Sequence, residues 1–237
     1  MEGKMTILEL KNVTKRYKNV TALDEVCLSI EQGKTIGLLG PNGSGKTTLI
    51  KIITGMLKRY RGVLYYEGKR WSYHAKEYIS YLPDVFVFDR ELNIKQLVRY
   101  YEDMFEDFNT QKFYALLSKF KIENRSRFDK LSKGNKEKLQ LAFVLARDAL
   151  IYIFDEPIGG VDPAVREIIL ETIMTYKQTN ATVILATHQI HDIENLFDEV
   201  VFLKQGKIVL HENTKTLIAK QGKSLVDCFK EVFRHDD

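Results

Sequence analysis

Residues 40–48, with the sequence GPNGSGKTT, constrain the fold of this chain more than any other segment. They fit the pattern G-x-x-x-x-G-K-[ST], and they lie between an apolar run, TIGLL, and a second apolar-rich run, TTLIKIITGML. A strand that enters such a glycine-rich turn and a helix that leaves it bring backbone N–H groups together around a phosphate. The segment therefore predicts a strand–loop–helix unit that binds phosphate.

The residue types in this phosphate loop (residues 40–48) indicate that the ligand is a nucleotide. Glycines let the backbone curl so that its N–H groups converge on phosphate oxygens. Lys46 can reach the β- and γ-phosphates, and the Thr47 hydroxyl can bind Mg²⁺. The residues that we expect to contact the nucleotide in this loop are Gly40, Pro41, Asn42, Gly43, Ser44, Gly45, Lys46, Thr47 and Thr48.

Strand-like and helical patterns alternate along most of the chain. Runs rich in β-branched and large apolar residues predict strands at 7–10, 26–30, 35–39 and 61–66. Runs of four apolar residues at 151–154, 183–186 and 200–203 are typical of strands buried on both faces of a parallel sheet. Residues 206–210 are a predicted hairpin partner of 200–203, followed by two short helices. Helical patterns cover 46–57, 93–120, 136–147, 163–178 and 190–197.

This alternation predicts an α/β fold with three parts. The core is a mainly parallel sheet with flanking helices, built from about 1–84 and 146–237. An antiparallel β layer precedes it at the N-terminus, and an α-helical subdomain is inserted at about 85–145. We expect the whole chain, 1–237, to form a single domain.

Two carboxylates follow the apolar run LIYIF directly. Asp155 and Glu156 would lie at the carboxyl edge of a parallel sheet, where α/β proteins bind ligands. There Asp155 could hold Mg²⁺, and Glu156 could act as the general base that polarises an attacking water. His188 follows the next apolar strand, so it should lie at the same edge and contact phosphate or water. These residues predict hydrolysis of the bound nucleotide.

Composition argues against several other classes of protein. The formal net charge of +4 is too small to indicate nucleic-acid binding, so we expect no nucleic-acid partner. Apolar runs such as 149–154 are far shorter than the about 20 residues of a membrane span. The N-terminus, MEGKMTILELK, does not resemble a signal peptide, and the two cysteines have no metal-ligand spacing. We therefore expect a soluble, intracellular protein.

Six segments in a fixed order make the chain resemble the ATP-binding subunit of ABC (ATP-binding cassette) transporters. The most specific is LSKGN (131–135), the signature segment, which is followed by a helical pattern. The resemblance covers about residues 7–233. Its six elements are Tyr17, GPNGSGKTT (40–48), YLPD (81–84), LSKGN (131–135), LIYIFDEP with GGVD (150–162), and ATH (186–188).

The resemblance implies roles for residues that chemistry alone does not assign. Tyr17 matches the aromatic residue that stacks on adenine. Ser132 and Gly134 match signature residues that contact the γ-phosphate of ATP bound to the opposite subunit. Asp162 matches a loop acid that acts across the dimer interface. Such subunits pair head to tail as homodimers or heterodimers, with two ATP molecules between them, so ATP closes the dimer and hydrolysis releases it.

The chain departs from the family pattern in two places. In the signature segment, Lys133 and Asn135 replace the usual glycine and glutamine of LSGGQ. Lys133 could attract the ATP of the partner subunit, or it could simply be a solvated residue at a basic helix start. Asp84 stands where the family often has glutamine, and its anionic oxygen can still lie near Mg²⁺.

The resemblance implies an ATPase that powers transport by a separate membrane-spanning subunit, at the cytoplasmic face of the membrane. An exporter-type cassette fits the short chain and the residue after YLP. In the family the region after Asp84 docks on the membrane subunit, and the candidate contacts are Phe86, Phe88, Tyr100 and Tyr101. The alternative is an ABC-type ATPase that serves a soluble assembly, such as iron–sulfur cluster delivery. A phosphate-loop kinase would leave the signature segment and His188 unexplained.

Overall fold

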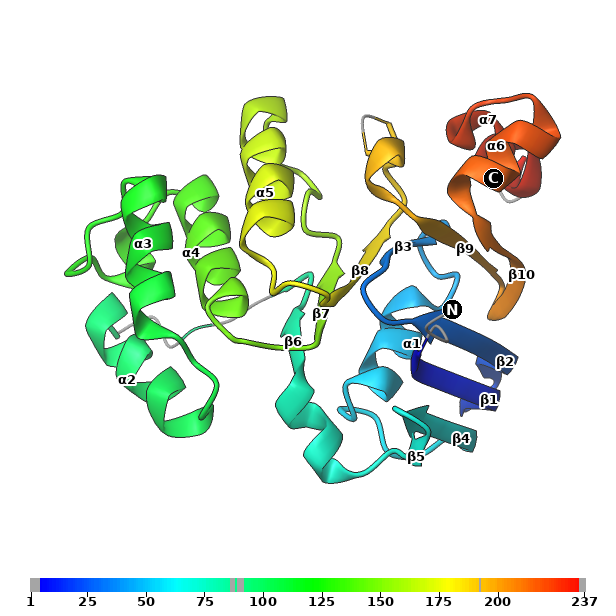
Figure 1. The fold of residues 1–237 in the computed structure, drawn as a ribbon, viewed down its shortest axis with the longest axis horizontal. Helices are drawn as coiled ribbons and strands as arrows, with labels where there is room; N and C mark the ends of the chain where they lie inside the picture. Colours follow the sequence, from blue (N-terminus) through cyan, green and yellow to red (C-terminus); the bar gives the residue numbers. More distant parts are fainter. Residues whose placement is uncertain (1–4, 86–87, 89–91, 192, 235–237) are drawn as a thin grey trace.

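The computed structural model describes residues 5–85, 88, 92–191 and 193–234. Within these residues the strands form two sheets, one of six strands and one of four. In Figure 1, α2, α3 and α4 lie at one side of the molecule, and the strands of the four-stranded sheet lie at the other. The six-stranded sheet lies between these helices and the four-stranded sheet.

The six-stranded sheet has the order β10-β9-β3-β8-β7-β6. Its neighbouring strands pair in parallel, except that the edge strand β10 is antiparallel to β9. The α/β core with a mainly parallel sheet is therefore confirmed, as is the hairpin of β9 and β10. The strands are β3 (Thr35–Leu39), β6 (Ile79–Leu82), β7 (Ile151–Asp155), β8 (Thr182–Thr187), β9 (Glu199–Lys204) and β10 (Lys207–Asn213).

Both faces of this sheet are covered, as the continuous apolar runs predict. On one face, Ile151, Ile153 and Ile184 pack with α1 (Lys46–Ile53) and with the four-stranded sheet. On the other face, Tyr152 and Phe154 pack in a cluster with the remaining helices. Alternate residues of one strand thus belong to two different hydrophobic clusters. A strand can be buried on both faces in this way because its residues form a continuous apolar run.

The four-stranded sheet has the order β2-β1-β4-β5 and is antiparallel, as predicted for the N-terminal layer. The strands are β1 (Thr6–Tyr17), β2 (Val20–Glu31), β4 (Arg61–Tyr66) and β5 (Lys69–Arg70). The second half of β1 is polar, yet Val13 and Lys15 point inward and are buried while Asn12 and Arg16 are exposed. This alternation continues the strand well beyond the predicted residues 7–10.

The segment at 93–120 forms two helices where the pattern predicts one helical stretch. Helix α2 (Ile94–Met104) begins with a capping box, in which Asn93 and Gln96 bond each other's backbone N–H groups at 3.0 and 2.9 Å. Helix α3 (Thr110–Phe120) begins at a second cap, where Asn109 accepts a bond from the Lys112 N–H group. The second cap explains the break, because a capping side chain sets the start of a new helix.

The helical part (residues 85–145) packs around aromatic rings, and the buried Arg147 is among the residues that join it to the sheet. Phe143 of α4 (Lys133–Leu145) contacts Tyr101 and Phe113, with ring centroids 4.3 and 4.4 Å apart. Arg147 is 4% exposed and donates to the Glu77 and Ile79 carbonyls and to Asp107. The boundaries of this part as a subdomain stay a prediction.

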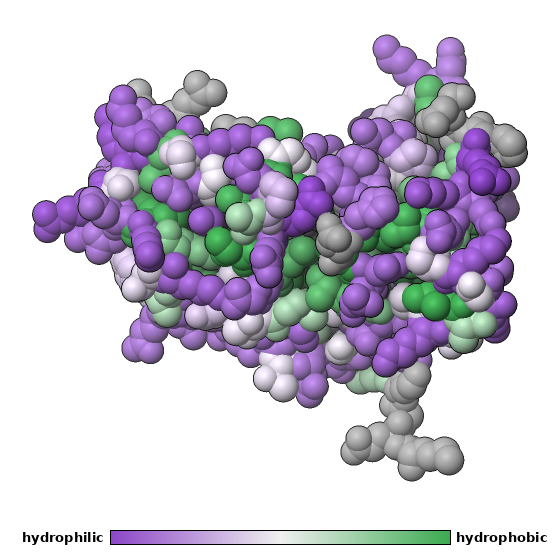
Figure 2. Space-filling view, turned by 90° about the horizontal axis from the view of Figure 1, so that it is seen from above, coloured by the Kyte–Doolittle hydropathy of each residue, from purple (hydrophilic) through white to green (hydrophobic). Residues whose placement is uncertain are grey.

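The predicted helix at 190–197 is wrong, because among the described residues 190–191 and 193–197 the helical structure is a short 3₁₀ helix, Glu194–Leu196. Helix α5 (Pro163–Tyr176) before it and the two C-terminal helices, α6 (Thr214–Gln221) and α7 (Leu225–Phe233), agree with the prediction. No helix in the described ranges combines the length and the apolar character needed to cross a membrane. Figure 2 shows one face from above, with hydrophobic residues in its middle and hydrophilic residues around them.

Candidate functional site

Four strands of the large sheet end beside one pocket. The phosphate loop follows β3, Asp84 follows β6, Asp155 ends β7, and His188 follows β8. The pocket has a volume of about 420 Å³, and its lining includes Lys46, Thr47, Asp84, Asp155 and Glu156. The sequence motifs that lie far apart along the chain are therefore brought together at the carboxyl edge of the sheet, as expected for an α/β fold.

The phosphate loop has no room for side chains at two of its glycines. A Cβ atom on Gly40 would lie 2.4 Å from the Leu203 carbonyl oxygen. Gly45 has a φ of 112°, and a Cβ there would lie 2.5 Å from the Ala22 carbonyl oxygen. The loop is also bonded to the turn after β9, because the Gly206 N–H group donates to the Ser44 carbonyl at 2.9 Å. The curled backbone is thus fixed by its surroundings before any ligand binds.

The ammonium group of Lys46 is buried within this loop. Its Nζ atom donates to the carbonyls of Gly40 (2.6 Å) and Pro41 (3.2 Å) and lies 3.6 Å from Oε1 of Glu156. Burial lowers the pKa of Lys46, and the nearby Glu156 and Asp155 carboxylates oppose this effect. The N–H groups of this ammonium that now donate to the two carbonyls could instead donate to the phosphate oxygens of a bound nucleotide.

Asp155 is 1% exposed, and among the described residues neither of its carboxylate oxygens has a hydrogen bond of normal geometry. Burial raises the pKa of Asp155; the Thr47 hydroxyl opposes this effect, and the Glu156 and Asp84 carboxylates add to it. The Tyr81 hydroxyl also interacts with this carboxylate. A buried carboxylate that lacks hydrogen bonds of normal geometry is nevertheless costly, because it has lost its contacts with water. These two oxygens are thus open to a cation or another ligand in the pocket.

Glu156 is held by residues of β8 and by the residue that follows this strand. Its backbone φ is 52°, in the left-handed region, and its N–H group donates to the Ala186 carbonyl at 2.8 Å. Oε2 accepts from the Thr187 hydroxyl at 2.9 Å, and His188 Nδ1 lies 2.8 Å from Oε1. His188 lies at the same edge of the sheet as Glu156, as predicted, and its contact there is with the carboxylate. Its contact with phosphate or water stays a prediction. Thr187 was not among the expected site residues, although the apolar run before it and the histidine after it fix its place.

A second, much smaller pocket of about 50 Å³ lies beside the same carboxylates. Asp84, Asp155 and Glu156 line it from the sheet, and Glu137 and Gln140 line it from α4. Burial raises the pKa of Glu137, partly offset by the Lys133 charge. The helix that follows the signature segment therefore reaches the site. Glu137 and Gln140 are three residues apart, so they lie on one face of α4. This spacing could have predicted from the sequence that both face the same site.

Tyr17 lies at the end of β1 with its ring 44% exposed. Lys15 Nζ lies 4.6 Å from the centroid of this ring, on the face that a cation prefers. Tyr17 does not line the phosphate-loop pocket, but Val20 and Thr21, just after it in the chain, do. An exposed, fixed ring close to the pocket is available for stacking on a base.

The signature segment and Asp162 lie at the starts of two helices. Ser132 caps α4, because its hydroxyl accepts from the Asn135 N–H group at 3.3 Å. Asp162 stands before Pro163 at the start of α5 and is exposed. None of the described residues that line the phosphate-loop pocket belongs to 131–135 or is Asp162. These residues are therefore separate from the nucleotide site of their own chain.

Comparison with known proteins decides the family. The model of the ABC transporter family matches residues 23–159, which is more than half of the chain. The chain belongs to the ABC transporter family. It is 31% identical over 220 residues to an uncharacterised ABC transporter ATP-binding protein of Methanocaldococcus jannaschii, covering 91% of this chain and 80% of the relative. The family resemblance of its motifs is thereby confirmed.

Two further proteins place the chain among the ATP-binding subunits of ABC transporters. The lantibiotic transport ATP-binding protein SrtF of Streptococcus pyogenes is 29% identical over 208 residues, covering 87% of this chain and 90% of SrtF. The solved structure of an ATP-binding subunit of an ABC transporter superposes with a TM-score of 0.83 at 26% identity. It covers 95% of this chain and 99% of that subunit. The predicted cassette fold is therefore confirmed.

The aromatic candidates for docking in this ABC cassette have different environments. Phe88 is 5% exposed and Tyr101 is half-buried, and both lie in the aromatic cluster of the helical part. Tyr100 is 58% exposed, so it alone of these three offers a free ring. Phe86 lies outside the described residues.

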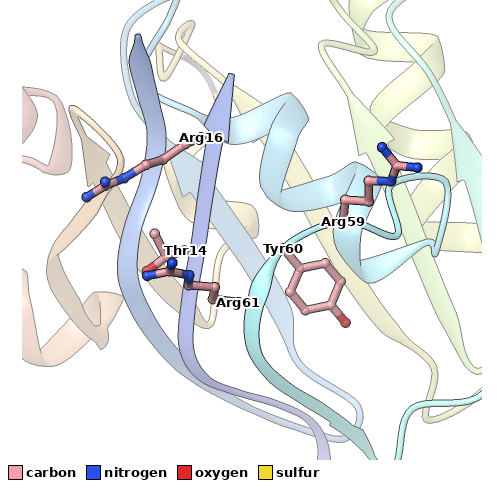
Figure 3. A pocket seen from close by; sticks show the side chains of 5 residues that line it. All are labelled: Thr14, Arg16, Arg59, Tyr60 and Arg61. Carbon is pink, nitrogen blue, oxygen red and sulfur yellow. The ribbon is translucent and has the colours of Figure 1, made fainter. Parts of the chain in front are cut away.

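A basic hollow of about 370 Å³ lies apart from the nucleotide site, over paired residues of β1 and β4. It is lined by Thr14, Arg16, Arg59, Tyr60 and Arg61 (Figure 3). In the figure Arg61 extends toward Thr14, whereas Arg59 extends away from Arg16 and Arg61. The three guanidinium groups do not converge on one point, so we assign no ligand to this hollow.

Proposed function

We propose that this chain hydrolyses ATP at the carboxyl edge of its sheet and drives transport by a separate membrane-spanning subunit. The observation that carries the proposal is the arrangement around the buried carboxylate of Asp155, whose oxygens have no hydrogen bond of normal geometry to the described residues. Lys46 lies on one side of it in the same pocket, and Glu156 follows it directly. A cationic group for phosphate, an open carboxylate for a metal ion and a fixed carboxylate for water are the parts that phosphoryl transfer to water requires.

The donor set in this pocket fits Mg²⁺. Thr47, Asp84 and Asp155 all line it, and they supply the hard oxygen ligands that Mg²⁺ prefers. Among the described residues, no group of three or more His, Cys, Asp or Glu side chains could hold a metal ion by itself. Such an ion would therefore be shared with ATP phosphates, as is usual for Mg²⁺ in ATPases. When bound there, Mg²⁺ neutralises charge on the phosphate oxygens.

Glu156 is the candidate general base, and its neighbours orient it. Bonds from Thr187 to one oxygen and from His188 to the other limit rotation of the carboxylate. A fixed base can accept a proton from a water aligned with the γ-phosphate without first losing rotational freedom. His188 is 38% exposed at its side chain, so it can also contact the phosphate, as expected from its position.

Lys46 would exchange partners when ATP arrives. Its present acceptors are two loop carbonyls, whose bonds to an ammonium group are weaker than bonds to phosphate oxygens. Burial lowers the pKa of Lys46, and the negative charge of the phosphates would raise this pKa again and keep the lysine protonated. Adenine would stack on the exposed ring of Tyr17, and the loop N–H groups would bind the phosphates.

The separation of the signature segment from its own nucleotide pocket supports a dimer. Ser132 and Gly134 would contact the ATP of a second subunit, and Asp162 would lie at the same interface. The N–H groups at the start of α4 would face that γ-phosphate with the positive end of the helix. Lys133 and Asn135 belong to the same contact surface. The second subunit would be a copy of this chain or a related ATPase subunit.

The membrane partner would dock on the helical part. Tyr100 and Met104 are 58% and 67% exposed and lie four residues apart, on one face of α2, and Val85 is 75% exposed. Exposed apolar side chains of this kind fit a protein interface better than open water. Export of a peptide or similar molecule is the direction that the relationship to SrtF favours. The chain would then lie at the cytoplasmic face of the membrane.

Two measurements test the proposal. The purified chain should release phosphate from ATP in the presence of Mg²⁺, and the Lys46→Ala variant should bind ATP more weakly. The tagged chain, expressed with its own operon, should also co-purify from detergent-solubilised membranes with a multi-span protein. A hydrolysing chain that is fully soluble and has no such partner would favour the alternative, an ABC-type ATPase that serves a soluble assembly.

A further inference from the structure

The ammonium group of Lys133 is bonded to the loop that leaves the catalytic carboxylate. Lys133 Nζ donates to the Gly160 carbonyl at 2.8 Å, and it lies 3.9 Å from Oε1 of Glu137. Lys133 is the first residue of α4, directly after the cap Ser132. Its side chain is therefore directed at a neighbouring loop of the same chain and is not simply a solvated charge at a helix start.

The bonded loop leads back to Glu156 in one further step. The Gly159 N–H group donates to the Glu156 carbonyl at 3.0 Å, and Gly160 follows directly in the chain. The same loop leads forward to Asp162 at the start of α5. One side chain at position 133 thus connects the signature segment to the backbone that holds both Glu156 and Asp162.

Stability alone does not explain this contact. The Lys133 side chain is 72% exposed, and exposed charged contacts contribute little to folding because water competes for both groups. Local preference fixes the middle of this loop poorly, because Gly159 and Gly160 are glycines, which have wide backbone freedom, and Gly160 has a φ of 67°. A contact with little effect on stability can still select one position of such a loop.

We propose that Lys133 is a positioning residue, which links the signature segment to the Glu156 backbone through the Gly160 carbonyl. The inference rests on the proposed function and adds a connection within one subunit. A phosphate that reaches the signature segment from the partner subunit would shift the start of α4, and Lys133 would carry that shift to the loop of Glu156. The line of contacts runs from one nucleotide site to the general base of the other.

A different role for Lys133 makes a different prediction. If its charge only attracted the partner's ATP, its removal would weaken ATP binding and raise KM, and salt would reduce the effect. If it positions the Gly160 carbonyl, its removal would lower kcat and leave KM at the wild-type value, because the phosphate-loop pocket is not touched. The two roles are therefore separated by steady-state kinetics.

The experiment compares Lys133→Met, Lys133→Arg and Lys138→Met with the wild-type chain. Met keeps the aliphatic length of lysine and removes the donor, whereas Arg retains a charged donor that can reach a carbonyl. Lys138 carries the same charge on the same helix and is not the residue that donates to the Gly160 carbonyl. Phosphate release is measured over a range of ATP, salt and protein concentrations, and thermal unfolding checks the fold.

We expect Lys133→Met to lower kcat by about tenfold, as a small displacement of a catalytic group does, with KM and the unfolding midpoint unchanged. Lys133→Arg should restore most of kcat, and Lys138→Met should equal the wild type. A raised, salt-dependent KM at unchanged kcat, or wild-type kinetics of Lys133→Met, would overturn the inference. A wild-type chain without ATPase activity would instead refute the proposed function.

Discussion

His188 Nδ1 lies 2.8 Å from Oε1 of Glu156, so the strand end of β8 holds a carboxylate that follows β7. The residue before the histidine, Thr187, bonds the other oxygen of the same carboxylate. The end of β8 thereby fixes a side chain that directly follows the adjacent parallel strand, β7.

Replacement of Thr187 by valine tests whether orientation of Glu156 matters for the rate. The substitution keeps the shape and removes a bond to a charged group, which is worth about 1.5 kcal/mol or about tenfold in kcat. KM for ATP should not change. Thr182→Val is the matched control, because Thr182 lies at the other end of β8 and bonds Gly33. Equal kcat values for both variants and the wild type would show that the Thr187 bond has no catalytic effect.

The two acids that face the metal position should differ in their effect. Asp155→Asn should raise the Mg²⁺ concentration needed for half-maximal activity strongly, because Asp155 is buried and water cannot easily replace its oxygens. Asp84→Asn should raise it less, because Asp84 is exposed to solvent and can exchange a ligand for water. Titration of ATPase activity with Mg²⁺ measures both. Unchanged rate and metal dependence in Asp84→Asn would remove Asp84 from the site.

The ring of Tyr17 should contribute to ATP affinity by stacking. Loss of base–aromatic stacking costs about 1–3 kcal/mol, so Tyr17→Ala should weaken ATP binding by roughly 5-fold to 150-fold. Tyr17→Phe keeps the ring and should bind like the wild type. Tyr65→Ala is the control, since Tyr65 also lies under a lysine but belongs to β4. Calorimetric titration with ATP distinguishes these variants, and equal affinities of Tyr17→Ala and Tyr17→Phe would contradict the stacking role.

Arg147 should stabilise the joint between the helical part and the sheet. Its guanidinium is buried and bonded to the Asp107 carboxylate and to two backbone carbonyls. Arg147→Met would leave these groups without a donor, which should lower the free energy of unfolding by about 3 kcal/mol. Arg127→Met removes an exposed ion pair with Asp129 and should cost less than about 1 kcal/mol. Urea denaturation measures both, and similar losses would contradict the assignment.

The central strands and the phosphate loop could be predicted from the sequence because their signals are local. TIGLL and the runs at 151–154, 183–186 and 200–203 are continuously apolar or nearly so, a pattern that favours burial on both faces of a sheet. The meeting of Asp155, Glu156 and His188 also followed, because parallel strands end at one edge. The position of Lys46 could also be predicted, because it directly follows the last glycine of the phosphate loop.

The remaining features depend on tertiary packing. Ile190 and Ile193 are buried three residues apart and the N–H groups bond three residues back, so 3₁₀ geometry replaced the predicted α-helix. The polar half of β1 is a strand because its pairing with β2 and β4 outweighs weak local preference. The Lys133 contact with Gly160 joins residues far apart in the chain, and no local pattern predicts such a bond.

The central claim is that Glu156 hydrolyses ATP held between two subunits, and one measurement tests it most directly. The Glu156→Gln variant is mixed with ATP and Mg²⁺, and its mass is measured by size-exclusion chromatography with light scattering. The account predicts a stable dimer with ATP, a monomer with ADP, and very slow phosphate release. A variant that remains monomeric with ATP, or that hydrolyses ATP at the wild-type rate, would contradict the account.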